Sequence, residues 1–253
     1  MLNRIFSPYQ TNPSNYNPLR KLLERIDFES LGDDTSSPRV FICATNVRTG
    51  LRRVFQNQEL TPEVLLASAC LPQLYQAVQI AEDFYWDGGY TGNPALAPLY
   101  LGTSATDLIV VGVNPIERAT VPQTARAIID RIDEISFNST LMVELGAIAF
   151  VEHLMKSAAN EAPLRLLHVH GIRDEALGSF GASSKMNNDW EFLQHLHEMG
   201  WRIADRWLAE NHKAVGNRST LDLSGLVPPK DDLLTSPSLL DTTSRPNATA
   251  KWA

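Results

Sequence analysis

The 253-residue chain is predicted to be an α/β protein in which helices cover both faces of a largely parallel sheet. Three apolar runs, 39–45, 108–113 and 164–170, have the continuous character of strands that are covered on both faces. Segments with helical periodicity separate them, and strands that alternate with helices favour a layered architecture with parallel pairing. We therefore expect a helix–sheet–helix arrangement.

The first half of the chain alternates short helices and strands. Asn17 and Pro18 form a helix start, with Asn as the cap and Pro in the first turn. Thr49 and Gly50 turn the chain between two strands, and Pro72 ends a helix. The expected order is irregular chain over 1–15, a helix over 19–26, a polar loop over 32–38, strands over 39–45 and 51–55, a helix over 61–69 and an aromatic strand over 84–86.

The second half contains the longer helices. Apolar residues recur at helical spacing from 122 to 156, which predicts one amphipathic helix or a pair with a break near Gly146. The strands 108–113 and 164–170 flank this segment, and a last helix is expected over 190–211. Residues 226–253 have too few large apolar side chains to offset the entropy of ordering, so they are expected to be a disordered tail after a single domain over 1–225.

Composition excludes some classes of function. A formal charge of -7 and the absence of a Lys/Arg-rich run argue against nucleic-acid binding. Cys43 and Cys70 lie in apolar segments without metal-ligand spacing, so we expect two buried free thiols and a reducing, cytoplasmic location. The longest uninterrupted apolar runs are far too short to span a bilayer, so any membrane contact is expected to be peripheral.

Asp87 is the most informative residue of the chain. It follows the aromatic strand and precedes Gly88 and Gly89. Two glycines let the backbone turn sharply and leave the carboxylate facing a cleft, where it can act as a general base. Asp-Gly is also a common turn dipeptide, so a plain turn residue is the competing interpretation.

Three motifs together resemble the patatin-like phospholipases, in the order and at the intervals of the bacterial members of that family. They are Cys43-Ala44-Thr45-Asn46 with Thr49-Gly50 and Val54-Phe55, then Ala67-Ser68-Ala69-Cys70-Leu71-Pro72, then Asp87-Gly88-Gly89 with Asn93-Pro94. The resemblance extends from about Ser7 to Asp222. It implies a layered α/β lipid acyl hydrolase that cleaves phospholipid or other acyl esters through an acyl-serine intermediate, without a metal or organic cofactor.

The resemblance also implies a role for each residue of the third motif. Asp87 would take a proton from the serine of a Ser–Asp dyad, and Gly88 and Gly89 would permit the close approach. The family further needs a glycine-rich oxyanion loop and a Gly-x-Ser-x-Gly turn. Neither occurs, since the only glycines four apart are Gly88 and Gly92, with Tyr90 between them. In the family both elements precede the point where this chain begins.

We therefore expect the chain to carry the C-terminal two thirds of such a domain, incomplete at the N-terminus and inactive alone. A truncated or split gene would explain this. The alternative is a noncatalytic module, derived from such a hydrolase, that binds lipid or a partner protein. A nucleotide-binding α/β protein is a weak third possibility because no glycine-rich phosphate loop follows a buried strand.

Other candidate residues have simpler explanations. Ser68 lies at a helix end without flanking glycines, which favours packing over a nucleophilic role. His168 and His170 share a strand face, and His195 and His197 are close in sequence, but neither pair has an acidic or Cys partner at metal-ligand spacing. A strand histidine could complete a triad with the candidate base, although such residues are commonly satisfied by hydrogen bonds.

Two apolar segments could contact lipid but are expected to form core. Aromatic residues over 84–86 more commonly pack inside than touch an acyl chain. The stripe over 128–154 has Asp130, Asp133 and Glu134 on its polar side rather than many lysines, which argues against a membrane-lying face. It could still cover a lipid pocket, and the expected partners remain an acyl-ester lipid and, transiently, a membrane surface.

Overall fold

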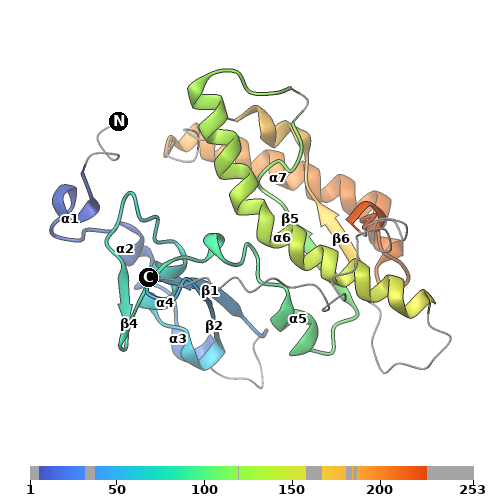
Figure 1. Cartoon of the computed structure of the whole chain (residues 1–253), viewed down its shortest axis with the longest axis horizontal. Coiled ribbons are helices and arrows are strands. Elements are labelled where there is room, and N and C mark those ends of the chain that lie inside the picture. The colour runs from blue at the N-terminus through green and yellow to red at the C-terminus, as the bar shows by residue number, and fades with distance from the viewer. Residues whose placement is uncertain are drawn as a thin grey trace, which may run out of the picture.

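The computed structural model describes residues 6–31, 38–118, 120–157, 167–180, 184 and 187–226. Within them the chain is a mixed α/β protein with two sheets that lie in different parts of the molecule (Figure 1). One sheet has four strands in the order β2-β1-β4-β3, and the other pairs β5 with β6.

The strands are β1 Phe41–Asn46, β2 Arg52–Gln56, β3 Val78–Ile80, β4 Asp83–Asp87, β5 Asp107–Val111 and β6 His168–Ile172. The α-helices are α1 Pro8–Thr11, α2 Leu19–Leu23, α3 Phe28–Leu31, α4 Pro62–Ser68, α5 Ala97–Leu101, α6 Ala125–Ser157 and α7 Trp190–Asn211. Short 3-10 turns include η2 Asn57–Glu59, η3 Gly88–Tyr90, η4 Glu175–Ser179, η6 His212–Ala214 and η7 Ser224–Leu226.

Most predicted elements are confirmed, because their end signals are local. Thr61 accepts a hydrogen bond from Val64 N–H at the start of α4, and the Asp189 side chain accepts from Glu191 and Phe192 at the start of α7. The segment predicted as one helix or a pair forms one continuous helix, Ala125–Ser157, without a break. The helices α1 and α3 and the strand β3 were not predicted, because elements of three or four residues show no apolar period. Predictions for residues 1–5, 32–37, 164–166 and 227–253 lie outside the described residues.

The expectation of a largely parallel sheet is wrong. Every pairing in the four-stranded sheet is antiparallel, and the only parallel pair in the described residues is β5 with β6. For β1 with β2 and for β3 with β4 the physical reason is a tight turn: Gly50 has φ +68° in the first, and Ala81 has φ 52° in the second. Strands joined by such short connections can only pair antiparallel.

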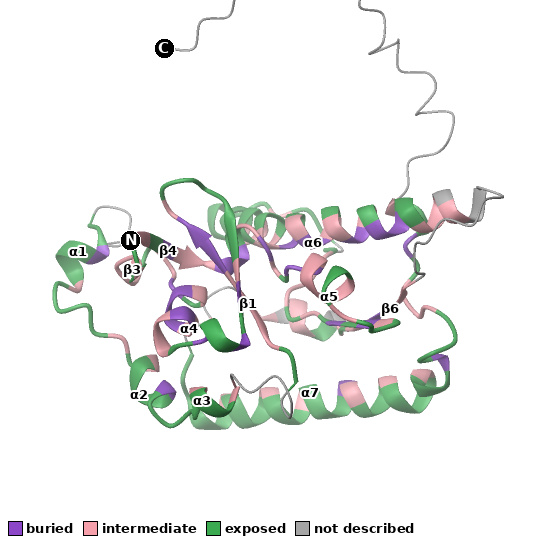
Figure 2. Cartoon of the chain, turned by 90° about the horizontal axis from the view of Figure 1, so that it is seen from below, coloured by how far each residue is buried: buried purple, intermediate pink, exposed green. Residues whose placement is uncertain are grey.

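Helices cover both faces of the β5–β6 sheet. Leu108, Val110 and Val169 point to one face, where they pack with Leu141 and Leu145 of α6. The neighbouring residue of β6, His170, points to the other face and contacts the Trp207 ring of α7. Figure 2 shows the two long helices on opposite sides of β6. This part of the fold therefore has the expected helix–sheet–helix order.

A second core lies between α4 and the four-stranded sheet. Val64 and Ala67 of α4 pack with Ala44, Phe55 and Tyr85. The Phe55 and Tyr85 rings meet edge to face, with centroids 5.6 Å apart. The prediction that the aromatic strand forms core is thus confirmed for Tyr85, whereas Phe84 is exposed.

The apolar stripe of α6 divides into two parts. Leu141, Leu145 and Ile148 are buried, as expected for core, but residues at the start of the helix, including Ile128, Ile132 and Ile135, are exposed, which corrects the expectation that the whole stripe is core. Within the described residues, Ala125–His153 is the segment long and apolar enough to cross a membrane by length and composition. Core helices of soluble proteins pass the same test.

Candidate functional site

Asp87 stands at the junction of β4 and η3, on the central part of the four-stranded sheet. Its N–H donates to Cys70 O at 2.9 Å, and its C=O accepts from Thr45 Oγ1 at 2.8 Å. One carboxylate oxygen, Oδ1, accepts from Gly89 N–H at 2.7 Å. These bonds fix the backbone on both sides and orient the carboxylate, so Asp87 is held rather than free to turn.

The other carboxylate oxygen of Asp87 is available. Oδ2 makes no hydrogen bond within the described part of the chain. No fully buried side-chain oxygen or nitrogen of the described residues lacks a partner, so Oδ2 must be in contact with solvent. Burial raises the pKa of Asp87, while the Gly89 hydrogen bond opposes that shift. A half-desolvated carboxylate with one open oxygen is a stronger base than a surface aspartate.

Three other partly buried acidic residues each have an ion-pair partner, which distinguishes them from Asp87. Glu144 pairs with Arg52, Glu134 pairs with Arg118, and Asp107 pairs with His170 (described below). No ion pair to Asp87 occurs among the residues that the structure describes. A partly buried carboxylate without a countercharge costs stability, and such groups are concentrated at functional sites.

Gly88 and Gly89 are required by packing on both sides of η3. A Cβ on Gly88 would lie 2.1 Å from Cys43 O, and a Cβ on Gly89 would lie 2.4 Å from Phe137 Cε1 and 2.9 Å from Asp87 Oδ1. The glycines therefore allow η3 to lie close to strand β1 and helix α6. The close approach of Asp87 to a serine, which the sequence predicted for them, stays a prediction.

Helix α6 holds the loop that follows the Asp-Gly-Gly motif. Asn93 Nδ2 donates to Phe137 O at 3.1 Å, and Asn93 N–H donates to Thr140 Oγ1 at 3.1 Å. One turn further, Glu144 Oε2 accepts the N–H groups of Leu96 and Ala97 at 2.6 and 2.9 Å. Three successive turns of α6 thus fasten the segment 93–97, a role that the sequence did not reveal because Glu144 looks like a solvent-facing acid.

The two thiols lie close enough to Asp87 to respond to its charge, which raises the question of a cysteine nucleophile. Burial raises the pKa of both Cys43 and Cys70 to about 11, and the charge of Asp87 adds to the rise in each. Only the thiolate is nucleophilic, so at neutral pH both cysteines are inert. The prediction of free thiols is confirmed, with Cys70 buried and Cys43 half-buried.

Ser68 is not brought into contact with the candidate base. It is the last residue of α4 and half-buried, and the described residues include no hydrogen bond between Ser68 and Asp87. The structure therefore gives no support for Ser68 as a replacement nucleophile.

His170 forms an acid–histidine–hydroxyl cluster that is separate from Asp87. Its Nε2 lies 3.0 Å from Asp107 Oδ1, and its Nδ1 lies 3.1 Å from Thr220 Oγ1. The ring is fully buried beside Trp207. Both nitrogens are occupied and no substrate can reach them, so the cluster ties the segment around Thr220 to the β5–β6 sheet. The idea that His170 completes a triad with Asp87 is wrong.

The lowered pKa of Asp107 should make the stability of the folded chain depend on pH. The Gly216 N–H, 2.7 Å away, and then His170 lower the pKa of Asp107 from the ordinary 3.8 to about 2. The depressed pKa stabilises the folded state above about pH 4, and this contribution is lost as the pH falls toward 2. We expect Asp107→Asn to lower the urea unfolding midpoint at pH 6, with a deficit that shrinks below pH 4. A deficit that is equal at both pH values would contradict this assignment.

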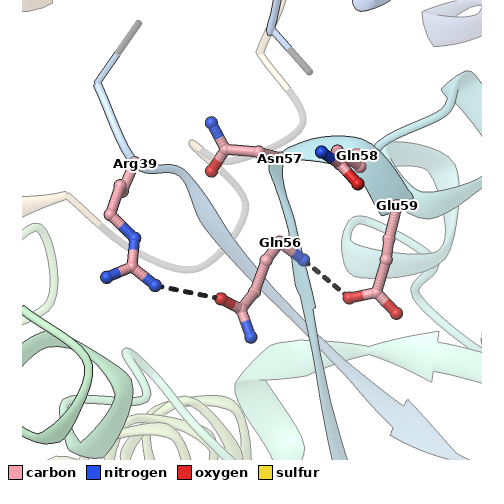
Figure 3. Close-up of a pocket in the computed structure, with 5 residues that line it drawn as sticks. All are labelled: Arg39, Gln56, Asn57, Gln58 and Glu59. Atoms are coloured by element: carbon pink, nitrogen blue, oxygen red, sulfur yellow. Dashed lines mark hydrogen bonds between the residues drawn. The ribbon is translucent and has the colours of Figure 1, made fainter. Parts of the chain in front are cut away.

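The described cavities lie away from Asp87. One is lined by Arg39, Gln56, Asn57, Gln58 and Glu59, at the end of β2 (Figure 3). Two hydrogen bonds join residues of its lining: Arg39 donates to Gln56 Oε1 at 3.3 Å, and Gln56 N–H donates to Glu59 Oε2 at 3.0 Å.

A second cavity lies on α7 and is lined by His197, Glu198, Trp201 and Arg202. His195, on the same helix, packs beside the Phe180 ring. The described residues contain no cluster of three His, Cys, Asp or Glu side chains that could hold a metal ion.

No known protein-family model and no curated protein matches this chain. The patatin-like resemblance therefore depends on the three sequence motifs.

Proposed function

We propose that Asp87 is the proton acceptor of a Ser–Asp lipid acyl hydrolase whose serine lies on a segment outside these 253 residues. The observation that carries this proposal is the held, half-buried carboxylate with a raised pKa, an open Oδ2 and no ion-pair partner in the described structure. Its position directly before Gly88 and Gly89 matches the motif of the patatin-like phospholipases. Substrates would be acyl esters such as phospholipids.

The chemistry requires Asp87 to take up and return a proton twice, once in acylation and once in deacylation. Asp87 Oδ2 takes the serine proton as the serine oxygen bonds to the ester carbonyl carbon. The carboxylic acid then returns that proton to the departing alcohol, which leaves an acyl-serine. Asp87 next takes a proton from water as the water oxygen attacks the acyl carbon, and it returns this proton to the serine oxygen as the acyl–serine bond breaks, which releases the fatty acid and regenerates the serine hydroxyl. The hydrogen bond from Gly89 to Oδ1 keeps Oδ2 directed outward throughout.

The test of this proposal is the hydrolysis of p-nitrophenyl butyrate by two preparations. We expect no Asp87-dependent turnover by the chain alone, and turnover when it is co-expressed with the polypeptide encoded immediately upstream. Asp87→Asn should abolish that turnover, whereas Asp83→Asn, at the exposed start of the same strand β4, should retain it. Turnover that survives Asp87→Asn would refute the assigned role.

A second candidate is the noncatalytic lipid-binding module, favoured by the exposed apolar side chains at the start of α6. It predicts binding to phosphatidylcholine vesicles without turnover in either preparation. An upstream region that encodes no Gly-x-Ser-x-Gly turn would favour this candidate over the hydrolase.

The ionised carboxylate of Asp87 should also lower the stability of the folded state. Because burial raises its pKa, the ionised form is penalised in the folded state at neutral pH. We expect Asp87→Asn to unfold at a higher urea concentration than the native chain at pH 7, with a difference that disappears as the pH falls through 4. Asp83→Asn should shift the opposite way, since Arg48 lowers the pKa of Asp83. A less stable Asp87→Asn variant would argue for a purely structural aspartate.

A further inference from the structure

Two aromatic side chains lie beside the carboxylate of Asp87. A Cβ on Gly89 would lie 2.4 Å from Phe137 Cε1 and 2.9 Å from Asp87 Oδ1. The Phe137 ring and the carboxylate therefore share one side of Gly89 and leave no room there for a side chain. The Tyr90 ring packs on Phe137, with ring centroids 5.3 Å apart and planes tilted by 50°. We refer to Tyr90 and Phe137 as the aromatic pair.

The turn η3 places Tyr90 on the same side of the backbone as Asp87. Asp87 is the N-cap of this 3-10 turn, and Tyr90 is its third residue. Side chains three residues apart eclipse each other in a 3-10 helix, because one turn takes three residues. Burial is the main cause that raises the pKa of Tyr90, and the charge of Asp87 adds to the rise, as expected for neighbours. Tyr90 is 39% exposed, so the aromatic pair reaches the surface next to the carboxylate.

The raised pKa of Asp87 comes from lost hydration rather than from a neighbouring charge. Burial raises this pKa, and the only opposing cause is a backbone hydrogen bond. The ionisable groups that face Asp87 are Cys43 from β1, Cys70 from the end of α4 and Tyr90 from η3. Burial raises the pKa of both thiols to about 11 and that of Tyr90 above its ordinary 10, so all three are uncharged at neutral pH. The charge of Asp133 on α6 acts on Tyr90.

We propose that Phe137, together with Tyr90, is a positioning residue of the hydrolase: the aromatic pair keeps water from one side of Asp87 and so makes it a stronger base toward the serine. This inference rests on the proposed function. A carboxyl group against an aromatic ring loses the hydration that stabilises its ionised form, and its affinity for a proton rises. Helix α6 thus has two tasks, because it fastens the segment 93–97 and supplies the Phe137 ring.

Two substitutions of Phe137 separate the exclusion of water from simple packing. Leucine and asparagine have similar sizes and shapes but differ in polarity, so both lose the packing of the ring to a similar extent. Phe137→Leu keeps an apolar group beside Asp87, whereas Phe137→Asn brings an amide that remains hydrated or bonds to the carboxylate. If position 137 served packing alone, the two variants would have the same effect on Asp87.

A ¹³C NMR titration of the Asp87 carboxyl group in the full chain measures the effect. The signal is assigned by its loss in Asp87→Asn. We expect a native midpoint above the ordinary 3.8, which Phe137→Leu should largely keep and Phe137→Asn should return toward 3.8. Tyr90→Asn should shift the midpoint in the same direction, so that the second ring provides the test if Phe137→Asn does not fold.

Phe192→Asn is the matched control for Phe137→Asn. Phe192 is also a helix residue whose ring packs on another ring, that of Phe180, with centroids 5.5 Å apart. It belongs to α7, which covers the other face of the β5–β6 sheet from α6. The Asp87 midpoint should therefore be unchanged in Phe192→Asn. A native midpoint at or below 3.8, or equal midpoints in Phe137→Leu and Phe137→Asn, would overturn the role of the aromatic pair.

Turnover of p-nitrophenyl butyrate by the co-expressed preparation tests the consequence for the reaction. Phe137→Asn should lower kcat by about tenfold with an unchanged KM, which is less than the loss of a whole general base. The acid limb of its pH–rate profile should move to lower pH, and Phe137→Leu should keep the native profile. Because the titration needs no turnover, the two proposals fail separately. A shifted midpoint in Phe137→Asn without any Asp87-dependent turnover would support the aromatic pair and overturn the hydrolase.

Discussion

Gly88→Ala is expected to lower the free energy of unfolding by about 3 kcal/mol, the upper end of the cost of overpacking. The added Cβ would lie 2.1 Å from Cys43 O and 2.6 Å from Cys43 C, and a backbone carbonyl in a paired strand cannot rotate away as a side chain can. Either β1 or η3 must move, and η3 carries the hydrogen bond to Asp87. Urea unfolding followed by circular dichroism measures the loss.

Gly200→Ala provides the control for this substitution. Gly200 lies inside α7, and no atom comes within 4 Å of the Cβ that alanine would add. Alanine is favoured over glycine in a helix interior by about 1 kcal/mol, so this variant should be more stable than the native chain. If Gly88→Ala were equally harmless, the close packing of η3 on β1 would be wrong.

Glu144→Ala is the second substitution with a large expected effect, a loss of about 2 to 3 kcal/mol in the free energy of unfolding. It removes the ion pair with Arg52 and leaves the N–H groups of Leu96 and Ala97 without their acceptor. Urea unfolding should show the loss. Since Glu144 holds the loop after the Asp-Gly-Gly motif, amide exchange at Leu96 and Ala97 should also become faster.

Glu63→Ala is the control for Glu144→Ala, because it measures the free energy of unfolding that is lost when an exposed, ion-paired carboxylate is removed. Glu63 pairs with Arg20, but both side chains are about half exposed, and exposed pairs contribute less than about 1 kcal/mol. A small effect at Glu63 with a large one at Glu144 would support the fastening role of Glu144. Equal effects at the two positions would contradict it.

The sequence predicts elements better than it predicts their pairing. Thr61 and Asp189 mark helix starts by chemistry that acts within one turn, so α4 and α7 were found with accurate bounds. Strand direction depends on which strands meet, and a single apolar run does not encode that. The exception is β1 with β2, because the Thr49-Gly50 turn between them is a local signal for a hairpin and so for antiparallel pairing.

The surroundings of Asp87 could likewise be predicted from the sequence only where the residues are neighbours in the chain. Asp87, Gly88 and Gly89 are adjacent in sequence, so their motif could be recognised directly. The groups that shape their surroundings come from far along the chain: Phe137 packs against Gly89, and Glu144 bonds to the loop from α6. Nothing local distinguishes Glu144 from the other acids of that helix. Only the fold reveals that it faces inward.

The bonds from Phe137, Thr140 and Glu144 have a mechanical consequence. They connect the loop after Asp87 to three successive turns of one helix, so the loop and the helix must travel as a single rigid piece. The far side of that helix displays uncovered Ile128, Ile132 and Ile135. A displacement of this part of α6 would therefore be passed to the loop beside the carboxylate through these hydrogen bonds.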